Sequence, residues 1–348
     1  MLSLVRAFPH APLYTSFYEP AGTFPEFAPV DVRTSPLNLV APLRRRHRLA
    51  LPLLASAFSR VRIAADVAIC SSSGWAHGAA VDGRKVVYCH APARWLYQTG
   101  RYLGDAGPIP RIALAGLRVP LERWDRNAAG TADRYLTNSA WVAHEIRRIY
   151  GIDAEVIHPP VAIDPEGPRR QPDALKPGYV LCVSRLLPYK NVRPIVAAFA
   201  ELSDERLIVV GEGPEETGLR AAGHNVHFAG SVDDEELRWL YGQAACLVAA
   251  SYEDFGLTPV EAAAFGKPTA ALRFGGYLDT VREDETGVFF DLPEAAAIAE
   301  AVRTLLGRSW DAAAIRRHAR GFSAERFTRR IREIAEEEME IAASGRSS

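Results

Sequence analysis

Residues 251–268 constrain this chain more than any other stretch of its sequence. They read Ser-Tyr-Glu-Asp-Phe-Gly-Leu-Thr-Pro-Val-Glu-Ala-Ala-Ala-Phe-Gly-Lys-Pro, and they follow an apolar run at 246–250 that is typical of a buried strand. Thr258, Pro259 and Glu261 predict a helix start, because threonine is a good N-cap, proline suits the first helical position and Glu261 completes a capping box. The stretch therefore predicts a strand, a glycine-containing turn and a helix in succession.

The predicted turn and helix start form a site for an anion. Gly256, Leu257 and Thr258 occupy the point where free backbone N–H groups and the positive end of the helix dipole meet. Glu253 and Glu261 flank this point, and an anion site beside two carboxylates suits a ligand with both phosphates and hydroxyls, such as a nucleotide sugar. The residues alone leave a structural interpretation open, in which Glu261 serves only the cap and Glu253 is a solvated loop acid.

The spacing of these residues resembles the donor-site signature of family 4 retaining glycosyltransferases. Glu253 and Glu261 form a Glu-x7-Glu pair with Phe-Gly between them. From Glu261 onward the sequence reads Glu-Ala-x-Ala-x-Gly-Lys-Pro. The resemblance implies an α/β protein with the GT-B fold, in which two Rossmann-like parallel-sheet domains face each other across a cleft. It also implies that Glu253 contacts the donor sugar, that Glu261 contacts the nucleotide ribose, and that residues 256–258 contact the donor diphosphate.

Two cations, Arg185 and Lys190, stand on the loop after a predicted strand at 179–183. Cations at the end of a strand can hold a diphosphate against a helix N-terminus, since arginine binds oxygens bidentately and lysine acts as a point charge. By themselves they are equally two exposed surface cations. The loop Ser-Arg-Leu-Leu-Pro-Tyr-Lys-Asn resembles the Arg-x4-Lys diphosphate element of the same family, and this resemblance assigns both side chains to the donor diphosphate.

The acid-rich segment at 233–236 predicts a helix start, because the dipole favours acids in the first helical turn. By the resemblance, Ser231 and Val232 just before it contact the nucleotide base. No Asp-x-Asp ends an apolar strand in this chain. We therefore expect no metal and no other cofactor, with Arg185, Lys190 and the helix amides in place of an ion.

His90 ends a predicted strand at 85–90 in the N-terminal half, where short apolar strands alternate with helices as in a parallel α/β structure. Chemistry in open parallel sheets lies at the carboxyl ends of strands, although a histidine there can simply bond a backbone carbonyl. The run Tyr-Cys-His-Ala-Pro-Ala-Arg at 88–94 is similar to an element of a bacterial family 4 subgroup that includes O-antigen-type mannosyltransferases. Residues 124–125 and 137–139 fit that subgroup too. The resemblance implies that His90 lies near the reacting sugar.

The beginning of the chain departs from that subgroup. Its members begin with a strand and a Gly-Gly-Ala-Glu loop, whereas this sequence begins inside what should be the first helix. Either the true start codon lies upstream or the gene is truncated. In the second case the N-terminal sheet lacks its first, central strand, and the protein binds a nucleotide sugar with little or no turnover.

A basic cluster, Arg-Arg-Arg-His-Arg at residues 44–48, leaves three interpretations open. It is a solvated helix face, or it binds the phosphate of a lipid-linked acceptor, or it docks the protein on anionic lipids with residues 49–58 in the membrane interface. No run reaches the roughly 18 apolar residues of a membrane span, and the N-terminus lacks the pattern of a signal peptide. We therefore expect a cytoplasmic protein, with peripheral contact at the inner membrane face through Arg44–Arg48 as one alternative.

The length of 348 residues suits two domains of ordinary size. A proline-rich stretch at 159–172 has no periodicity and marks the boundary between them. We predict an N-terminal acceptor-side domain at 1–165 and a C-terminal nucleotide-sugar domain at 166–321. The resemblance implies that a last helix at 322–348 returns to the first domain.

Charge and cysteine usage exclude some classes of function. A formal net charge of −1 argues against a nucleic-acid-binding protein, which usually presents a basic face. The cysteines lie in or at the end of apolar runs without a Cys-x-x-Cys pair, so we expect free buried thiols. These cysteines are Cys70, Cys89, Cys182 and Cys246.

The functional prediction is a retaining hexosyltransferase with a nucleotide diphosphate sugar as donor and a glycan or lipid-linked acceptor. GDP-mannose is preferred as donor because of the subgroup resemblance alone, and a UDP-sugar is the alternative. A sugar-nucleotide epimerase would need an acid/base set of its own, and none is evident in the sequence. A dinucleotide oxidoreductase is disfavoured, because no Gly-x-Gly-x-x-Gly follows a strand.

Overall fold

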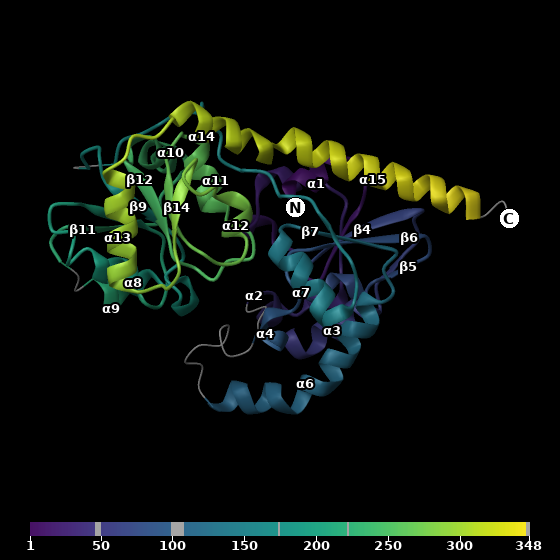
Figure 1. The fold of residues 1–348 in the computed structure, drawn as a ribbon. Coiled ribbons are helices and arrows are strands. Elements are labelled where there is room, and N and C mark those ends of the chain that lie inside the picture. The colour runs from purple at the N-terminus through teal and green to yellow at the C-terminus, as the bar shows by residue number, and fades with distance from the viewer. Residues whose placement is uncertain (46–49, 99–107, 173–174, 221–222, 346–348) are drawn as a thin grey trace. The chain divides into compact units, whose positions relative to one another are not determined.

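The computed structural model describes residues 1–45, 50–98, 108–172, 175–220 and 223–345. The chain divides into two compact units (Figure 1). The N-terminal unit comprises Met1–His158 together with Ala324–Ser348, and the C-terminal unit comprises Pro159–Ser323. These divisions lie at 158/159 and 323/324, whereas the sequence predicted boundaries at 165/166 and 321/322.

The C-terminal unit is built on a six-stranded sheet of the order β11-β10-β9-β12-β13-β14, in which every strand pair is parallel. Its strands are β9 (Val180–Val183), β10 (Leu207–Val210), β11 (Val226–Gly230), β12 (Cys246–Ala249), β13 (Thr269–Leu272) and β14 (Gly287–Phe290). Its helices are α8 (Val192–Ala198), α9 (Glu216–Leu219), α10 (Asp234–Gln243), α11 (Leu257–Ala264), α12 (Tyr277–Thr280), α13 (Ala295–Leu306) and α14 (Ala312–Ala319).

Both faces of this sheet are buried, which explains why its strands are continuous apolar runs in the sequence. Along β9, Val180 and Cys182 pack into one core cluster with α8 and α13, while Leu181 packs into another with α10 and α11. Successive side chains of a strand point to opposite faces, so the sheet lies between two helical layers (Figure 1). The unit is a three-layer parallel α/β structure, as the sequence predicted.

The N-terminal unit holds a four-stranded parallel sheet of the order β4-β6-β7-β8 and two smaller parallel pairs, β1-β2 and β3-β5. Its strands are β1 (Leu13–Thr15), β2 (Val32–Thr34), β3 (Arg62–Ile63), β4 (Val67–Ser72), β5 (Ala80–Val81), β6 (Arg84–Cys89), β7 (Arg134–Thr137) and β8 (Glu155–Val156). Its helices are α1 (Leu2–Ala7), α2 (Ala41–Arg45), α3 (Leu51–Ser59), α4 (Arg94–Tyr97), α6 (Pro108–Ala129), α7 (Ala140–Tyr150) and α15 (Ala324–Gly345).

Short 3-10 helices complete the connections of both units. They are η1 (Pro20–Gly22), η2 (Pro25–Phe27), η3 (Pro36–Leu39), η5 (Ala76–Gly78), η6 (Pro188–Lys190) and η7 (Arg320–Phe322). Of these, η5 lies in the loop after β4 and η6 lies in the loop after β9.

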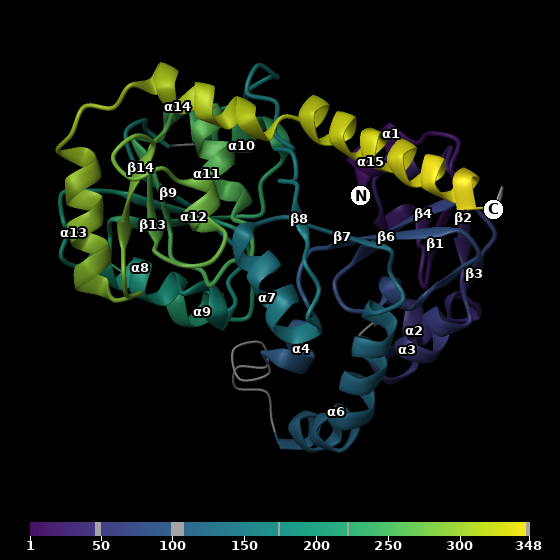
Figure 2. The same cartoon turned by 45° about the vertical axis from the view of Figure 1, so that its right-hand side comes forward.

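The last helix, α15, belongs to the N-terminal unit although it follows the C-terminal unit in the sequence. It lies alongside α1 (Figure 2), and Phe327, Ile331 and Ile334 are buried in the same cluster as Val86 and Tyr88 of β6. Side chains of α15 outside this cluster form a network of ion pairs with side chains of the sheet. The network consists of Arg134, Glu155, Arg330 and Glu337, with N–O distances of 2.5–2.9 Å.

Candidate functional site

The strand order of the C-terminal unit creates a topological switch point between β9 and β12. These strands are neighbours in the sheet, but the chain forms β10 and β11 on one side of them and β13 and β14 on the other. Loops that leave two such strands diverge, and ligands of open α/β sheets bind in the crevice between them. The loop after β9 carries Arg185 and Lys190, and the loop after β12 carries Glu253.

Lys190 and Glu253 are brought together at this switch point. The Lys190 Nζ lies 2.5 Å from the Glu253 Oε2, and the two side chains are 13% and 21% exposed. Asn191 fixes the arrangement, because its Nδ2 donates to the backbone oxygen of Ala250 at 2.8 Å while its own backbone has a φ of 52°. A predicted diphosphate-binding cation and a predicted sugar-binding acid therefore meet, although 63 residues separate them in the sequence.

Arg185 occupies the exposed side of the same loop. Its guanidinium donates to the hydroxyl of Tyr189 at 3.0 Å, and the loop is anchored by a hydrogen bond from the Leu186 N–H to the Glu212 oxygen at 2.9 Å. The Arg185 side chain thus bonds within its own loop. The structure joins Lys190 to the loop before α11 and leaves Arg185 beside it as an accessible cation.

The start of α11 differs from the sequence prediction. The helix begins at Leu257 with Gly256 as its N-cap at a φ of 87°, so the predicted N-cap at Thr258 and its capping box with Glu261 are wrong. Gly256 reaches the left-handed region that other residues disfavour, and this lets the helix start before Thr258. A Cβ at Gly256 would also lie 2.5 Å from the Cδ1 of Tyr277.

A glycine N-cap has a direct consequence for ligand binding. In the part of the chain that the structure describes, no N-cap side chain satisfies the first turn of α11. The first N–H groups of a helix have no partner within the helix itself. Those of Leu257 and Thr258 are therefore the groups that an anion at this helix end would meet.

Glu261 is the fifth residue of α11 and has a partner that the sequence did not reveal. The hydroxyl of Tyr241 on α10 donates to the Glu261 Oε2 at 2.7 Å, and Tyr241 is itself fully buried and stacked on Phe265. Burial raises the pKa of Glu261. Because this contact replaces the predicted cap, the capping interpretation of Glu261 does not hold, and Tyr241 orients the carboxylate.

The acid-rich segment is a helix start, as predicted. Asp233 is the N-cap of α10 and accepts a hydrogen bond from the Glu236 N–H at 3.0 Å. Ser231 is exposed just before it, and Val232 packs against the core cluster of α10. Both lie after β11, at the edge of the same parallel sheet.

In the N-terminal unit, His90 directly follows β6 and is held on three sides. Its N–H donates to the Ser72 oxygen at 2.8 Å, its oxygen accepts from the Asn138 Nδ2 at 2.9 Å, and its Nε2 lies 2.9 Å from the Ser71 Oγ. The Nε2 thus bonds a hydroxyl rather than a backbone carbonyl. Burial lowers the pKa of His90 to about 4, so the imidazole is neutral at pH 7 and carries a single N–H.

Residues 137–139 serve to position the end of β6. Thr137 donates through its Oγ1 to the Cys89 oxygen at 2.9 Å, Asn138 holds His90, and Ser139 caps α7 by accepting from the Val142 N–H at 3.2 Å. The Asn138 Oδ1 is buried and makes no hydrogen bond within the described residues. In the sequence this tripeptide stands out only by resemblance and Ser71 not at all, because neither has a local pattern that shows a contact with another strand.

Asp125 of the Trp-Asp pair at 124–125 is a buried structural anchor. The Asp125 carboxylate pairs with the His77 Nε2 at 3.0 Å and accepts hydrogen bonds from the hydroxyls of Tyr97 and Tyr150. The Ser72 Oγ lies 2.8 Å from the His77 Nδ1. This Ser-His-Asp series resembles a hydrolase triad in composition only, because its three members are at most 2% exposed and offer no accessible nucleophile.

The basic cluster is only partly within the described residues. Arg44 pairs with Glu19 at 2.8 Å and donates to the Asn38 oxygen at 2.9 Å, and α2 ends at Arg45. Residues 46–48 lie outside the described ranges. Across those ranges, no helix combines the length and the hydropathy that crossing a bilayer requires. The four cysteines are free and buried, as predicted.

Sequence comparison finds a family match within the C-terminal unit. Residues 165–322 match the family described as "Glycosyl transferases group 1". Two D-inositol 3-phosphate glycosyltransferases are similar over longer stretches. That of Salinispora tropica is 28% identical over 250 residues, which cover 60% of this chain and 52% of the relative. That of Mycobacterium tuberculosis is 31% identical over 255 residues, which cover 65% and 51%. The chain thus spans about half the length of these relatives.

Structural comparison extends to nearly the whole chain. Anabaena HepE in complex with UDP and glucose has a TM-score of 0.67 at 18% identity, and the match covers 96% of this chain and 94% of HepE. Sucrose-phosphate synthase of Thermosynechococcus elongatus has a TM-score of 0.65 at 20% identity, covering 96% and 90%. The chain has the GT-B glycosyltransferase fold, and residues 165–322 of its C-terminal unit are similar to glycosyl transferases group 1.

Proposed function

We propose that this protein is a retaining glycosyltransferase that transfers a hexose, with mannose favoured, from a nucleotide diphosphate sugar to a glycan or lipid-linked acceptor. The observation that carries this proposal is the β9–β12 switch point of the C-terminal unit. There Lys190 pairs with Glu253 at 2.5 Å, next to a helix whose first turn begins at a glycine with a φ of 87°. A cation and an uncapped helix end can bind the diphosphate of a nucleotide sugar, and an acid can bind the hydroxyls of its sugar.

Each group has a definite role in the proposal. The diphosphate lies between Lys190, Arg185 and the N–H groups of Leu257 and Thr258, so that the negative charge of the leaving group is stabilised as the glycosidic bond breaks. Binding of the diphosphate to Lys190 releases Glu253, which then orients the donor sugar. Glu261, oriented by Tyr241, accepts the ribose hydroxyls.

The remaining assignments are the base and the reacting sugar. Ser231 and Val232 contact the base at the edge of the sheet. His90 contacts the reacting sugar as a neutral hydrogen-bond donor or acceptor, in line with the lowering of its pKa to about 4 by burial.

Retention follows from the proposed geometry of attack. The proposal assigns no side chain as a covalent nucleophile. The acceptor oxygen attacks the anomeric carbon from the face that the diphosphate leaves, the bond to the diphosphate oxygen breaks, and that oxygen takes the acceptor proton. In the proposal, Arg185, Lys190 and the N–H groups at the start of α11 stabilise the diphosphate charge in place of a metal ion. Transfer is therefore expected to continue in EDTA.

The donor and the setting are proposed from similarity. GDP-mannose is the first choice because of the sequence elements around His90, which fit O-antigen-type mannosyltransferases and a role in cell-surface polysaccharide synthesis. UDP-sugars are the second choice, since HepE is described in complex with UDP and glucose. The inositol phosphate in the names of the curated relatives adds a phosphorylated polyol to the acceptors worth testing. Such an enzyme would act in the cytoplasm, with Arg44–Arg48 as the segment for contact with the membrane.

The test is a donor and acceptor screen by product mass, with the anomeric configuration of the product read by NMR. Glu253→Gln is expected to lower transfer by about 100-fold or more, because it removes a charge at the reacting sugar. Glu300→Gln is the matched control, since Glu300 is exposed on α13 and should leave transfer unchanged. Full transfer by Glu253→Gln contradicts the site.

The alternative is a protein that binds a nucleotide sugar without turnover. It is distinguished by calorimetry with GDP and UDP alongside the transfer assay. Nucleotide binding with neither transfer nor donor hydrolysis favours the alternative.

A further inference from the structure

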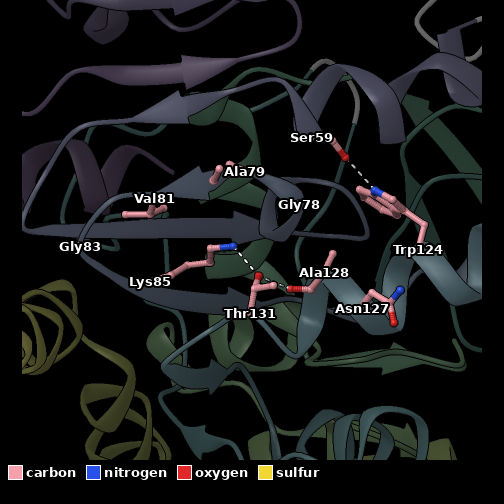
Figure 3. A pocket seen from close by; sticks show the side chains of 11 residues that line it. Ser59, Gly78, Ala79, Val81, Gly83, Lys85, Trp124, Asn127, Ala128 and Thr131 are labelled. Carbon is pink, nitrogen blue, oxygen red and sulfur yellow. Dashed lines mark hydrogen bonds between the residues drawn. The ribbon is translucent and has the colours of Figure 1, made fainter.

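The N-terminal unit contains a cavity lined by residues that include Lys85, Trp124 and Thr131 (Figure 3). Its volume is about 420 Å³, which lies in the usual range for small-molecule sites. Lys85 lines it near the start of β6, whereas His90 follows the end of that strand. Because a strand advances about 3.3 Å per residue, the cavity is separate from the proposed reaction site.

Lys85 forms the polar end of this cavity and is only 5% exposed. Its Nζ donates to the Thr131 Oγ1 at 2.6 Å (Figure 3). It also donates to the His77 oxygen at 3.1 Å, and both acceptors are neutral. Among the described residues, no carboxylate forms an ion pair with this Nζ. The carboxylate of Asp133 instead accepts the Lys85 backbone N–H at 2.7 Å and pairs with Arg84.

A buried ammonium with neutral partners is electrostatically incomplete. Burying a charge is costly unless an opposite charge accompanies it, and burial accordingly lowers the pKa of Lys85. Two of its three N–H groups donate to acceptors among the described residues, and within that part of the chain the third is left for a ligand. An anion in the cavity would supply an opposite charge in direct contact with the ammonium, beyond the attraction of the Asp133 carboxylate.

Trp124 forms a flat apolar wall of the same cavity. Its Nε1 donates to the Ser59 Oγ at 2.8 Å, which fixes the plane of the indole. The ring lies directly against Gly78, where a Cβ would be only 2.4 Å from the Trp124 Cζ2. Asn127 is exposed at the margin of the cavity on the same helix as Trp124 (Figure 3).

We propose that this cavity is an accessory binding site for a small organic monocarboxylate with a flat apolar body. The carboxylate would bond the Lys85 ammonium, and the body would lie along the Trp124 indole. One free N–H and one cation match a single negative charge. A phosphate monoester would bring a second charge for which the lining offers no second cation among the described residues.

The test uses the full chain and benzoate as the probe, with benzamide as its neutral counterpart, in calorimetric or NMR titrations. Wild-type protein is expected to bind benzoate more tightly than benzamide. Lys85→Met should remove that preference. Asn127→Asp places a negative charge at the exposed margin and should weaken benzoate binding by about tenfold or more while benzamide binding is unchanged.

The matched control is Arg123→Gln. It changes the net charge by the same amount as Asn127→Asp, and Arg123 is exposed on α6 outside the cavity. It should bind benzoate as wild type does. Should Lys85→Met fail to fold, Asn127→Asp decides. No measurable benzoate binding, equal binding of benzoate and benzamide, or wild-type affinity in Asn127→Asp overturns the proposal. None of these outcomes depends on sugar transfer.

Discussion

At the scale of single residues, Lys190 and Glu253 form the ion pair on which the proposed function depends. Their ion pair of 2.5 Å neutralises two side chains that are mostly shielded from water. A diphosphate would compete with Glu253 for Lys190, so donor binding and release of the acid are coupled in the proposed function. Two side chains assigned to different parts of the donor thus act as one switchable pair.

His90 leads to a prediction about pH and stability. Burial lowers its pKa in the folded protein to about 4, whereas an unfolded histidine titrates near 6.5. Below pH 6.5 the unfolded chain therefore binds a proton that the folded protein does not bind until about pH 4. The free energy of unfolding should fall across this window by roughly 3 kcal/mol from His90 alone.

Urea denaturation at pH 7 and pH 4.5 measures this contribution. His90→Gln should lose less stability between the two values than wild type does. His10→Gln is the control, because His10 is exposed, and it should follow wild type. If wild type and His90→Gln lose the same stability over this range, the imidazole is not held neutral by the fold.

At the scale of elements, the start of α11 depends on one glycine. Gly256→Ala should lower the free energy of unfolding by about 2–4 kcal/mol, because alanine is disfavoured at a φ of 87° and its Cβ meets the ring of Tyr277. Gly178→Ala is a matched control in the same unit. Gly178 has a φ of 83° but open space around it, so it should cost only about 1–2 kcal/mol. Denaturation curves that show equal costs would remove the role of the contact with Tyr277.

The elements themselves were largely predictable, and their contacts were not. Apolar runs located the strands, because a sheet buried on both faces needs continuous apolar segments. The position of the α11 start was wrong, since Thr258 and Pro259 form a strong local signal that a glycine with positive φ overrides. Tyr241 and Ser71 were missed for another reason. Their partners Glu261 and His90 lie on other elements, and no local pattern encodes such a contact.

At the scale of the whole molecule, α15 makes the N-terminal unit discontinuous in sequence. Ile331 is fully buried in the cluster of Val86 and Tyr88, so Ile331→Ala should lower the stability of that unit by about 2–5 kcal/mol. Ile341 lies on the same helix and is 48% exposed. Ile341→Ala should therefore change stability by no more than about 0.5 kcal/mol. Hydrogen exchange of the β6 amides measures the stability of the N-terminal unit directly. Equal protection of these amides in Ile331→Ala and Ile341→Ala would contradict the role of α15 in that unit.

In the proposed function, the C-terminal unit binds the donor diphosphate at the β9–β12 switch point. The most direct measurement is calorimetric binding of GDP and UDP against GMP and UMP. Wild type should bind the diphosphates about tenfold or more tightly than the monophosphates, and Lys190→Met should lose that preference. Lys176→Met is the control, because Lys176 is an exposed lysine of the same unit, and it should keep the preference. A Lys190→Met protein that still prefers diphosphates, or a wild type that never does, would contradict the claim.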